Sequence, residues 1–185
     1  MSAAGGPAGP TDPARPANRS GPAGDAGHPA TLRPADPDFA ARVRASFAGQ
    51  RLMETFGARL VRVEPGEVDV ELPFRDDLTQ QHGYLHAGAV AAIADTACGY
   101  AAITLIAADA TVLSVEFKLN LLAPARGDRL IARGRVLRPG RTLTVCTGEV
   151  VAVTAGRETP VAAILATMIA LPARPEGAAG EAGPR

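Results

Sequence analysis

Apolar and polar residues along the first part of the chain follow a helical period and then an alternating one. Four segments stand out before residue 74: helical turns over 39–47 and 51–56, and alternating stretches over 60–63 and 68–72. The first helix follows acidic residues and has apolar residues four positions apart, which is typical of an amphipathic helix. Pro65 and Gly66 form a turn between the alternating stretches, which therefore predict a β-hairpin.

A long and almost unbroken apolar segment lies in the middle of the chain, from about His86 to Ile106, after a polar loop over residues 74–85. It predicts a buried helix. Four later segments alternate and predict strands: 111–122, 129–138, 141–153 and 161–171. Strands joined by tight turns pair antiparallel. The order predicts an α+β fold in which a curved antiparallel sheet of about six strands wraps one long central helix.

The first strand after this helix, over residues 111–122, has the clearest alternation. It divides into an apolar face and a polar face: Val115, Phe117, Leu119 and Leu121 on the first, and Ser114, Glu116, Lys118 and Asn120 on the second. Successive side chains of a strand point to opposite sides of the sheet. We therefore expect Ser114 to lie on the face opposite the apolar residues.

The composition confines the folded part to the middle of the chain. Residues 1–37 and 172–185 are mostly Ala, Gly and Pro, and they predict disordered tails because they have too few apolar side chains to offset the entropy of ordering. Residues 38–171 are long enough for one domain. The chain has 19 basic and 19 acidic residues, dispersed along it, so no nucleic-acid-binding surface is expected.

Two further patterns bear on where the protein is found. Cys98 and Cys146 lack a C-x-x-C spacing, and the N-terminal segment has no apolar core of a secretory signal, so we expect free thiols and a cytoplasmic protein. Residues 87–107 are long enough to cross a membrane. Asp95 lies in their middle, however, alanine dominates over leucine, and no Lys or Arg closes either end, so a buried helix is favoured.

The most informative motif is the loop from Gln80 to Gly88, which leads into the central helix and is followed there by Asp95. A polar turn, a glycine and a helix start can direct backbone N–H groups at an anion or a carbonyl oxygen. A carboxylate among Ala, Ile and Val is costly to bury unless it has a partner or a function. A serine hydrolase or a nucleotide-binding protein is not indicated, because the chain has no G-x-S-x-G, P-loop or G-x-G-x-x-G sequence.

Three stretches, 80–95, 114–117 and 122–128, resemble in order and spacing the PaaI-type hotdog-fold acyl-CoA thioesterases. The signature of that family is an H-G-G helix start with an Ala-Asp pair ending seven residues beyond the last glycine. The resemblance implies the hotdog fold, with a curled sheet around a long helix, and a homodimer or homotetramer with active sites at the dimer interface. One difference is Ala87 in place of the first glycine, which an alanine can replace if its φ is negative.

The resemblance implies hydrolysis of an acyl-CoA thioester. Backbone N–H groups near Ala87 and Gly88 would form the oxyanion hole at the positive end of the helix dipole. Asp95 would act as general base on water or as nucleophile, and in the family this carboxylate usually comes from the other subunit. Gln80 would orient the water or the thioester, and Ser114 would help to hold the water.

The remaining candidates concern binding. His86 is expected to fix the substrate-binding turn by hydrogen bonding, and Arg138 and Arg141, at the tip of a hairpin, are candidates to bind the phosphates of CoA. The resemblance implies no cofactor. A metal is not expected either, because the pair His82 and His86 lacks the Glu of a zinc-binding helix.

Other interpretations stay open at this point. A hotdog hydratase or dehydratase would act on the same thioesters, although it typically has an Asp and a His on the central helix, and no His follows His86 here. A non-catalytic acyl-CoA or acyl-carrier binding module would bind its ligand without releasing a thiol. Asp95 alone could be a structural acid, and Gln80 and Ser114 could be ordinary surface residues.

Overall fold

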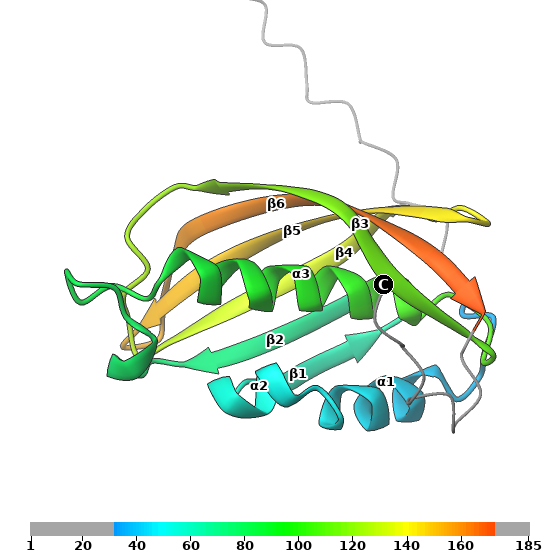
Figure 1. The fold of residues 1–185 in the computed structure, drawn as a ribbon, viewed down its shortest axis with the longest axis horizontal. Helices are drawn as coiled ribbons and strands as arrows, with labels where there is room; N and C mark the ends of the chain where they lie inside the picture. Colours follow the sequence, from blue (N-terminus) through cyan, green and yellow to red (C-terminus); the bar gives the residue numbers. More distant parts are fainter. Residues whose placement is uncertain (1–31, 173–185) are drawn as a thin grey trace, which may run out of the picture. The chain divides into compact units, whose positions relative to one another are not determined.

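Six strands and three α-helices follow the predicted order along residues 32–172, which the computed structural model of the chain describes (Figure 1). Their bounds are α1 (Phe39–Ala48), α2 (Arg51–Phe56), β1 (Arg59–Glu64), β2 (Glu67–Pro73), α3 (Ala87–Ile103), β3 (Ala110–Leu121), β4 (Arg129–Arg138), β5 (Leu143–Thr154) and β6 (Arg157–Pro172), with a short 3-10 turn over Asp76–Leu78. The predicted α+β fold is confirmed. Residues 1–31 and 173–185, which hold most of the predicted tails, lie outside the described residues, so the disorder of the tails and the domain bounds 38–171 stay predictions.

The segment just before α1 packs on the fold, although the sequence assigned it to the N-terminal tail. Asp36 is 7% exposed and accepts a hydrogen bond from Nε of Arg42 in α1, at 2.8 Å. Leu32 packs against the core. The partner of Asp36 lies in the first helix, which explains why this short polar segment is held in place.

The strands form one antiparallel sheet in the order β1-β2-β4-β5-β6-β3, and α3 lies across its concave face (Figure 1). The core lies between this helix and the sheet, where Ile93, Ala97 and Ala101 of α3 and Val70 and Leu130 of the sheet are fully buried. Burial of this apolar surface is the main force that holds the helix on the sheet.

The helix comes very close to the sheet because two glycines face it. Gly134 of β4 and Gly148 of β5 are direct neighbours in the strand register. A Cβ on Gly134 would lie 2.3 Å from the backbone carbonyl carbon of Ala97, and a Cβ on Gly148 would lie 3.4 Å from the sulfur of Cys98. Gly134 therefore sets the depth at which α3 lies on the sheet, and Gly148 beside it leaves room for the Cys98 side chain.

α3 ends at Ile103, three residues before the predicted end at Ile106. Thr104 accepts the backbone N–H of Gly66 in the β1–β2 turn (2.7 Å), and Arg42 donates to the carbonyls of Ile103 (3.2 Å) and Ile106 (2.9 Å). Arg42 therefore satisfies two carbonyls at the end of the helix, and both Arg42 and Gly66 come from distant parts of the chain. No helix among residues 32–172 is both long and apolar enough to cross a membrane.

β3 is an edge strand of the sheet, paired with β6, and it contains a β-bulge at Val115. A bulge adds one residue and re-aims its neighbours. The Ser114 side chain therefore turns toward α3, where its hydroxyl lies 2.7 Å from Asp95 Oδ1. Phe117 lies opposite the buried Ala166 and faces the helix too. The prediction that Ser114 and the apolar residues lie on opposite faces is wrong, because the alternation alone does not include the bulge.

Candidate active site

The loop before α3 is held by backbone hydrogen bonds at three points. The N–H of Leu85 donates to the Ala125 carbonyl (2.9 Å), the N–H of His86 donates to the Leu78 carbonyl (2.9 Å), and the N–H of Gln80 donates to the Tyr84 carbonyl (2.8 Å). Gly83 has a left-handed backbone conformation (φ 77°), which makes the tight turn between Gln80 and Tyr84 possible. The loop therefore fixes the start of the helix relative to the 122–125 segment.

The first turn of α3 leaves one backbone donor free. The N–H of Gly88 donates to Nδ1 of His86 (2.8 Å), and the N–H groups of Ala89 and Val90 donate to the His86 carbonyl. The N–H of Ala87 has no acceptor among residues 32–172. Of the two donors expected from the sequence, Gly88 is therefore occupied by the cap and Ala87 is available. The φ angle of Ala87 is negative, as an alanine in this role requires.

The free donor lies beside a cavity of about 420 Å³. Gln80 and Ala87 line it together with Tyr84, Val90 and the segment 121–125. The surface of the cavity is mostly apolar. The side-chain carbonyl of Gln80 accepts the backbone N–H of His82. Helix N-termini carry a partial positive charge, so a carbonyl or an anion is the group that suits this corner of the cavity.

Asp95 lies two turns further along α3, paired with Ser114 of β3. The Ser114 hydroxyl donates to Asp95 Oδ1 (2.7 Å) and also lies 3.4 Å from the sulfur of Met168. The other carboxylate oxygen, Oδ2, has no hydrogen-bond partner among residues 32–172. Asp95 is half-buried, on the side of α3 that lies beside the edge strand β3. It lines a second, smaller cavity of about 150 Å³.

One copy of the chain does not bring the donor and the acid together. Ala87 and Asp95 are eight residues apart on one helix, which corresponds to about 12 Å along the axis. They line different cavities. A carbonyl held by the N–H of Ala87 is therefore too far for attack by a group activated by the same chain's Asp95.

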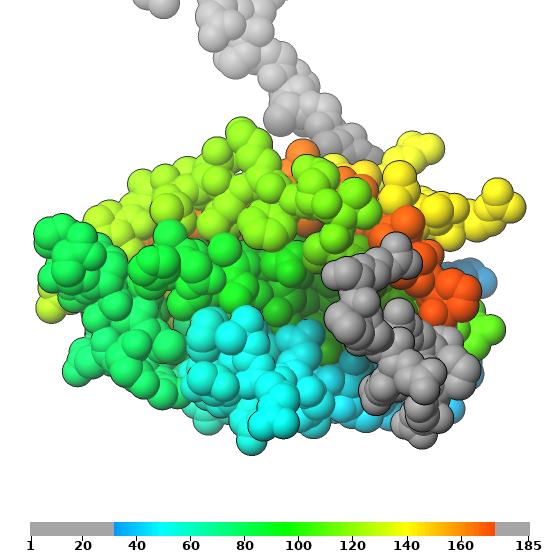
Figure 2. All heavy atoms as spheres, viewed as in Figure 1, coloured from blue at the N-terminus to red at the C-terminus, as the bar shows by residue number. Residues whose placement is uncertain are grey.

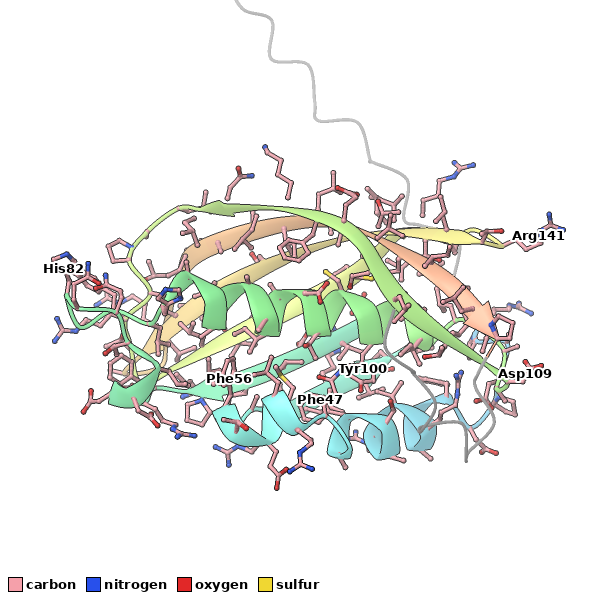
Figure 3. The ribbon with its side chains drawn as sticks, in the orientation of Figure 1. Phe47, Phe56, His82, Tyr100, Asp109 and Arg141 are labelled. Carbon is pink, nitrogen blue, oxygen red and sulfur yellow. The ribbon has the colours of Figure 1, made fainter. Side chains whose placement is uncertain are left out.

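The two arginines predicted to bind CoA phosphates are not near the start of α3. Figure 3 shows Arg141 and His82 at opposite ends of the sheet, and Arg138 ends the strand β4 beside the same hairpin as Arg141. A single chain therefore does not assemble these arginines with the loop, and their role stays a prediction.

The structure adds a contact between α1 and α3 beside Asp95 that the sequence pattern did not indicate. Tyr100 of α3 and Ser46 of α1 lie near Asp95, with 3.2 Å between their hydroxyl oxygens. Phe47 packs on Tyr100 with ring centroids 5.8 Å apart, and Figure 3 shows the two rings between α1 and α3. Burial raises the pKa of Tyr100, so its hydroxyl stays protonated and can donate a hydrogen bond. No local pattern indicates this contact, because Ser46 and Tyr100 are 54 residues apart along the chain.

Comparison with known proteins identifies the family of this fold. The profile of the thioesterase superfamily matches residues 82–158, which include the end of the loop, α3 and the strands β3 to β5. The 1,4-dihydroxy-2-naphthoyl-CoA hydrolase of Listeria monocytogenes is 31% identical over 94 residues, which are 51% of this chain and 76% of that protein. The chain belongs to the thioesterase superfamily.

Solved structures agree with this assignment. A thioesterase family protein from Silicibacter pomeroyi is 49% identical, covers 72% of this chain and 98% of its own, and superposes with a TM-score of 0.71. The Escherichia coli PaaI protein, at 19% identity and a TM-score of 0.67 over 74% of this chain and 95% of its own, shares the fold. The hotdog fold and the PaaI-type resemblance expected from the sequence are confirmed.

Proposed function

We propose that the protein hydrolyses acyl-CoA thioesters at a composite site formed by two copies of the chain. Two features of α3 carry the proposal: a free N-terminal donor at Ala87, and a half-buried carboxylate, Asp95, that has one free oxygen. Both lie on the same helix and too far apart to act on one carbonyl. Membership of the thioesterase superfamily supports the reaction class.

In the proposed reaction the thioester carbonyl oxygen accepts the N–H of Ala87 and, next to it, a hydrogen bond from Gln80. Asp95 of the other copy takes a proton from water through Oδ2, and the water oxygen attacks the carbonyl carbon. The tetrahedral intermediate places its negative charge at the helix N-terminus. The carbon–sulfur bond then breaks, and the thiolate of CoA leaves and takes up a proton. Ser114 keeps Asp95 aligned by donating to Oδ1. Direct attack by Oδ2, through an anhydride, would use the same free oxygen.

The exposed apolar surface of β3 supports the proposal that two copies of the chain associate. This edge strand exposes large apolar side chains that a monomer would leave in water: Leu113 (58% exposed), Val115 (54%), Phe117 (43%) and Leu121 (56%). An unpaired edge with exposed apolar residues favours pairing with another chain. A homodimer through this edge would bring a second α3 close to the first. Assembly into a homotetramer and a cytoplasmic location remain predictions.

Asp95→Asn is the first test, with a thiol-reactive dye to follow CoA release from a panel of acyl-CoAs. We expect hydrolysis to fall by two or more orders of magnitude, since loss of the base removes most of the acceleration of this step. Size-exclusion chromatography with light scattering should show the same oligomer as the wild type. Unchanged turnover would rule out the proposed role of Asp95. Saturable binding without CoA release in the wild type would indicate a binding module, and addition of water to the acyl group a hydratase.

Ala87→Pro tests the donor without disturbing the helix. Proline is favoured at the first helical position, and the preceding residue, His86, already has the extended conformation that proline requires (φ −62°, ψ 139°). The substitution therefore removes one N–H, and we expect turnover to fall by about a hundredfold.

Mixing the two inactive variants separates a composite site from a site within one chain. A heterodimer of Ala87→Pro and Asp95→Asn has one composite site with both groups intact. Co-refolding equal amounts should restore about a quarter of the wild-type activity per chain if the two chains mix randomly. No recovery would show that both groups act within one chain.

A further inference from the structure

A small cavity beside Asp95 lies between α1 and β3, with α3 as its floor. Most of its lining residues come from these three elements and from Gln50, which precedes α2: Ser46, Gln50, Asp95, Gly99, Tyr100, Thr111 and Val112. Its volume is about 150 Å³. Figure 2 shows atoms of α3 reaching the surface between the cyan of α1 and α2 and the yellow-green of β3. The cavity therefore lies beside Asp95, and it shares no lining residue with the cavity at the helix start.

Gly99 forms part of the floor, one helical turn after Asp95 and on the same face of α3. A glycine inside a helix weakens it relative to alanine. Packing does not explain this glycine, because a Cβ at position 99 would have nothing within 4 Å. Gly134 is different, since a Cβ there would collide with the backbone of Ala97. An empty space above a mid-helix glycine, beside the proposed catalytic acid, points to a ligand group that occupies it.

We propose that this cavity receives the acyl group of the substrate and that Gly99 determines how large that group can be. The inference rests on the proposed thioesterase function. A cavity of this volume holds a group about as large as one benzene molecule. One wall of the cavity is polar, because the hydroxyls of the exposed Ser46 and the buried Tyr100 lie 3.2 Å apart and Gln50 also lines the cavity. A long alkyl chain would have to cover these polar groups without bonding to them. The substrate class is therefore short or single-ring acyl thioesters.

The test measures kcat/KM for acetyl-, butanoyl-, hexanoyl-, benzoyl- and decanoyl-CoA. We expect the wild type to prefer hexanoyl or benzoyl over decanoyl by at least tenfold. Gly99→Ala adds one methyl group to the floor, and it should lower the ratio of benzoyl to acetyl hydrolysis by about tenfold. Gln50→Ala removes part of the polar wall formed with Ser46 and Tyr100, and it should raise the ratio of decanoyl to hexanoyl hydrolysis by at least threefold. A general structural defect would not make Gly99→Ala disfavour the larger acyl group while Gln50→Ala favours it.

Gly49→Ala is the matched control, since it makes the same change at the end of α1, where a Cβ meets only ordinary contact (3.5 Å from the Ser46 carbonyl), and Gly49 does not line the cavity. It should leave all ratios unchanged. A preference for decanoyl, or an equal loss for every acyl group in Gly99→Ala, would overturn the inference. Loss of the oligomer in Gly99→Ala would also overturn it, because it would show that the glycine is needed for contact with a second chain. No hydrolysis of any acyl-CoA by the wild type would instead contradict the proposed function.

Discussion

The two faces of α3 use small residues for opposite purposes. On the sheet face, Ala97 touches the backbone of Gly134, and the absence of a side chain there permits contact. On the open face, Gly99 follows Asp95 by one turn, and the absence of a side chain leaves space. The sequence contains a glycine in both cases, and only the surroundings tell them apart. A small residue therefore indicates function only where packing does not already require it.

Gly134→Val gives the largest expected effect and tests the sheet face. The new side chain has no room, because even its Cβ would lie 2.3 Å from the Ala97 carbonyl carbon, and backbone atoms cannot move aside as a flexible side chain can. We expect a loss of about 3 kcal/mol in the free energy of unfolding, typical of severe overpacking. Urea unfolding followed by circular dichroism measures it. A loss below about 1 kcal/mol would mean that α3 can shift on the sheet and that the contact is not rigid.

Alkaline pH should also destabilise the contact between α3 and the sheet, because both thiols are buried there. Burial raises the pKa of Cys146 to about 12 and raises that of Cys98 even more. Since the thiols ionise more easily in the unfolded chain, the stability they contribute is complete below the unfolded pKa of about 8.5 and is lost as pH rises toward the folded pKa. We expect a fall of roughly 2 kcal/mol in the free energy of unfolding between pH 8.5 and pH 9.5, about half of it from each thiol.

Two measurements check this interpretation of the alkaline effect. Cys146→Ala should make the dependence of stability on pH about half as steep, whatever its effect on stability itself. Both thiols are completely buried, so the folded protein should not react with a thiol dye at pH 8, and two thiols should react after unfolding. Rapid reaction of the folded protein would contradict the burial of both groups.

Much of the fold could be predicted from the sequence, because it depends on local patterns. The alternation from Leu60 onward, the turn at Pro65 and Gly66 and the apolar run of α3 each reflect neighbours within a few residues. The end of α3 was predicted three residues too late, since the Ile103 and Ile106 carbonyls accept from Arg42 and the Thr104 hydroxyl accepts the N–H of Gly66. Contacts across some 40 to 60 residues of chain have no periodic signature.

The candidate site was predictable as a set of residues and much less so as a geometry. The loop and Asp95 stood out because polar groups in an apolar segment are unusual. The orientation of Ser114 depends on a bulge at Val115, which no alternation reveals. The use of the Gly88 N–H by the His86 ring depends on a side-chain rotamer. Both details changed the proposed chemistry, because one gives Asp95 a partner and the other leaves Ala87 as the free donor.

Ser114→Ala tests the open face at Asp95. The substitution removes the hydrogen bond to Oδ1, and a hydrogen bond to a charged group contributes about 1.5 kcal/mol or more, so we expect kcat to fall by about tenfold or more. KM should change little, because Ser114 touches the acid rather than the cavity at the start of the helix. Ser114→Thr retains the hydroxyl and should keep most of the activity. A loss of the same size in both variants would show that packing around Met168, and not the hydrogen bond, is what matters.

Gly99→Ala gives the smallest expected effect on stability and separates the two faces most clearly. The new methyl group meets nothing within 4 Å, and alanine favours a helix interior over glycine, so the free energy of unfolding should rise by about 1 kcal/mol. The melting temperature should rise by roughly 3 °C in differential scanning fluorimetry. Gly134→Ala, which places the same methyl group against Ala97, should destabilise the protein instead. If both substitutions destabilised it, the open face of α3 would also be tightly packed, against a second copy of the chain, because the single chain leaves that position empty.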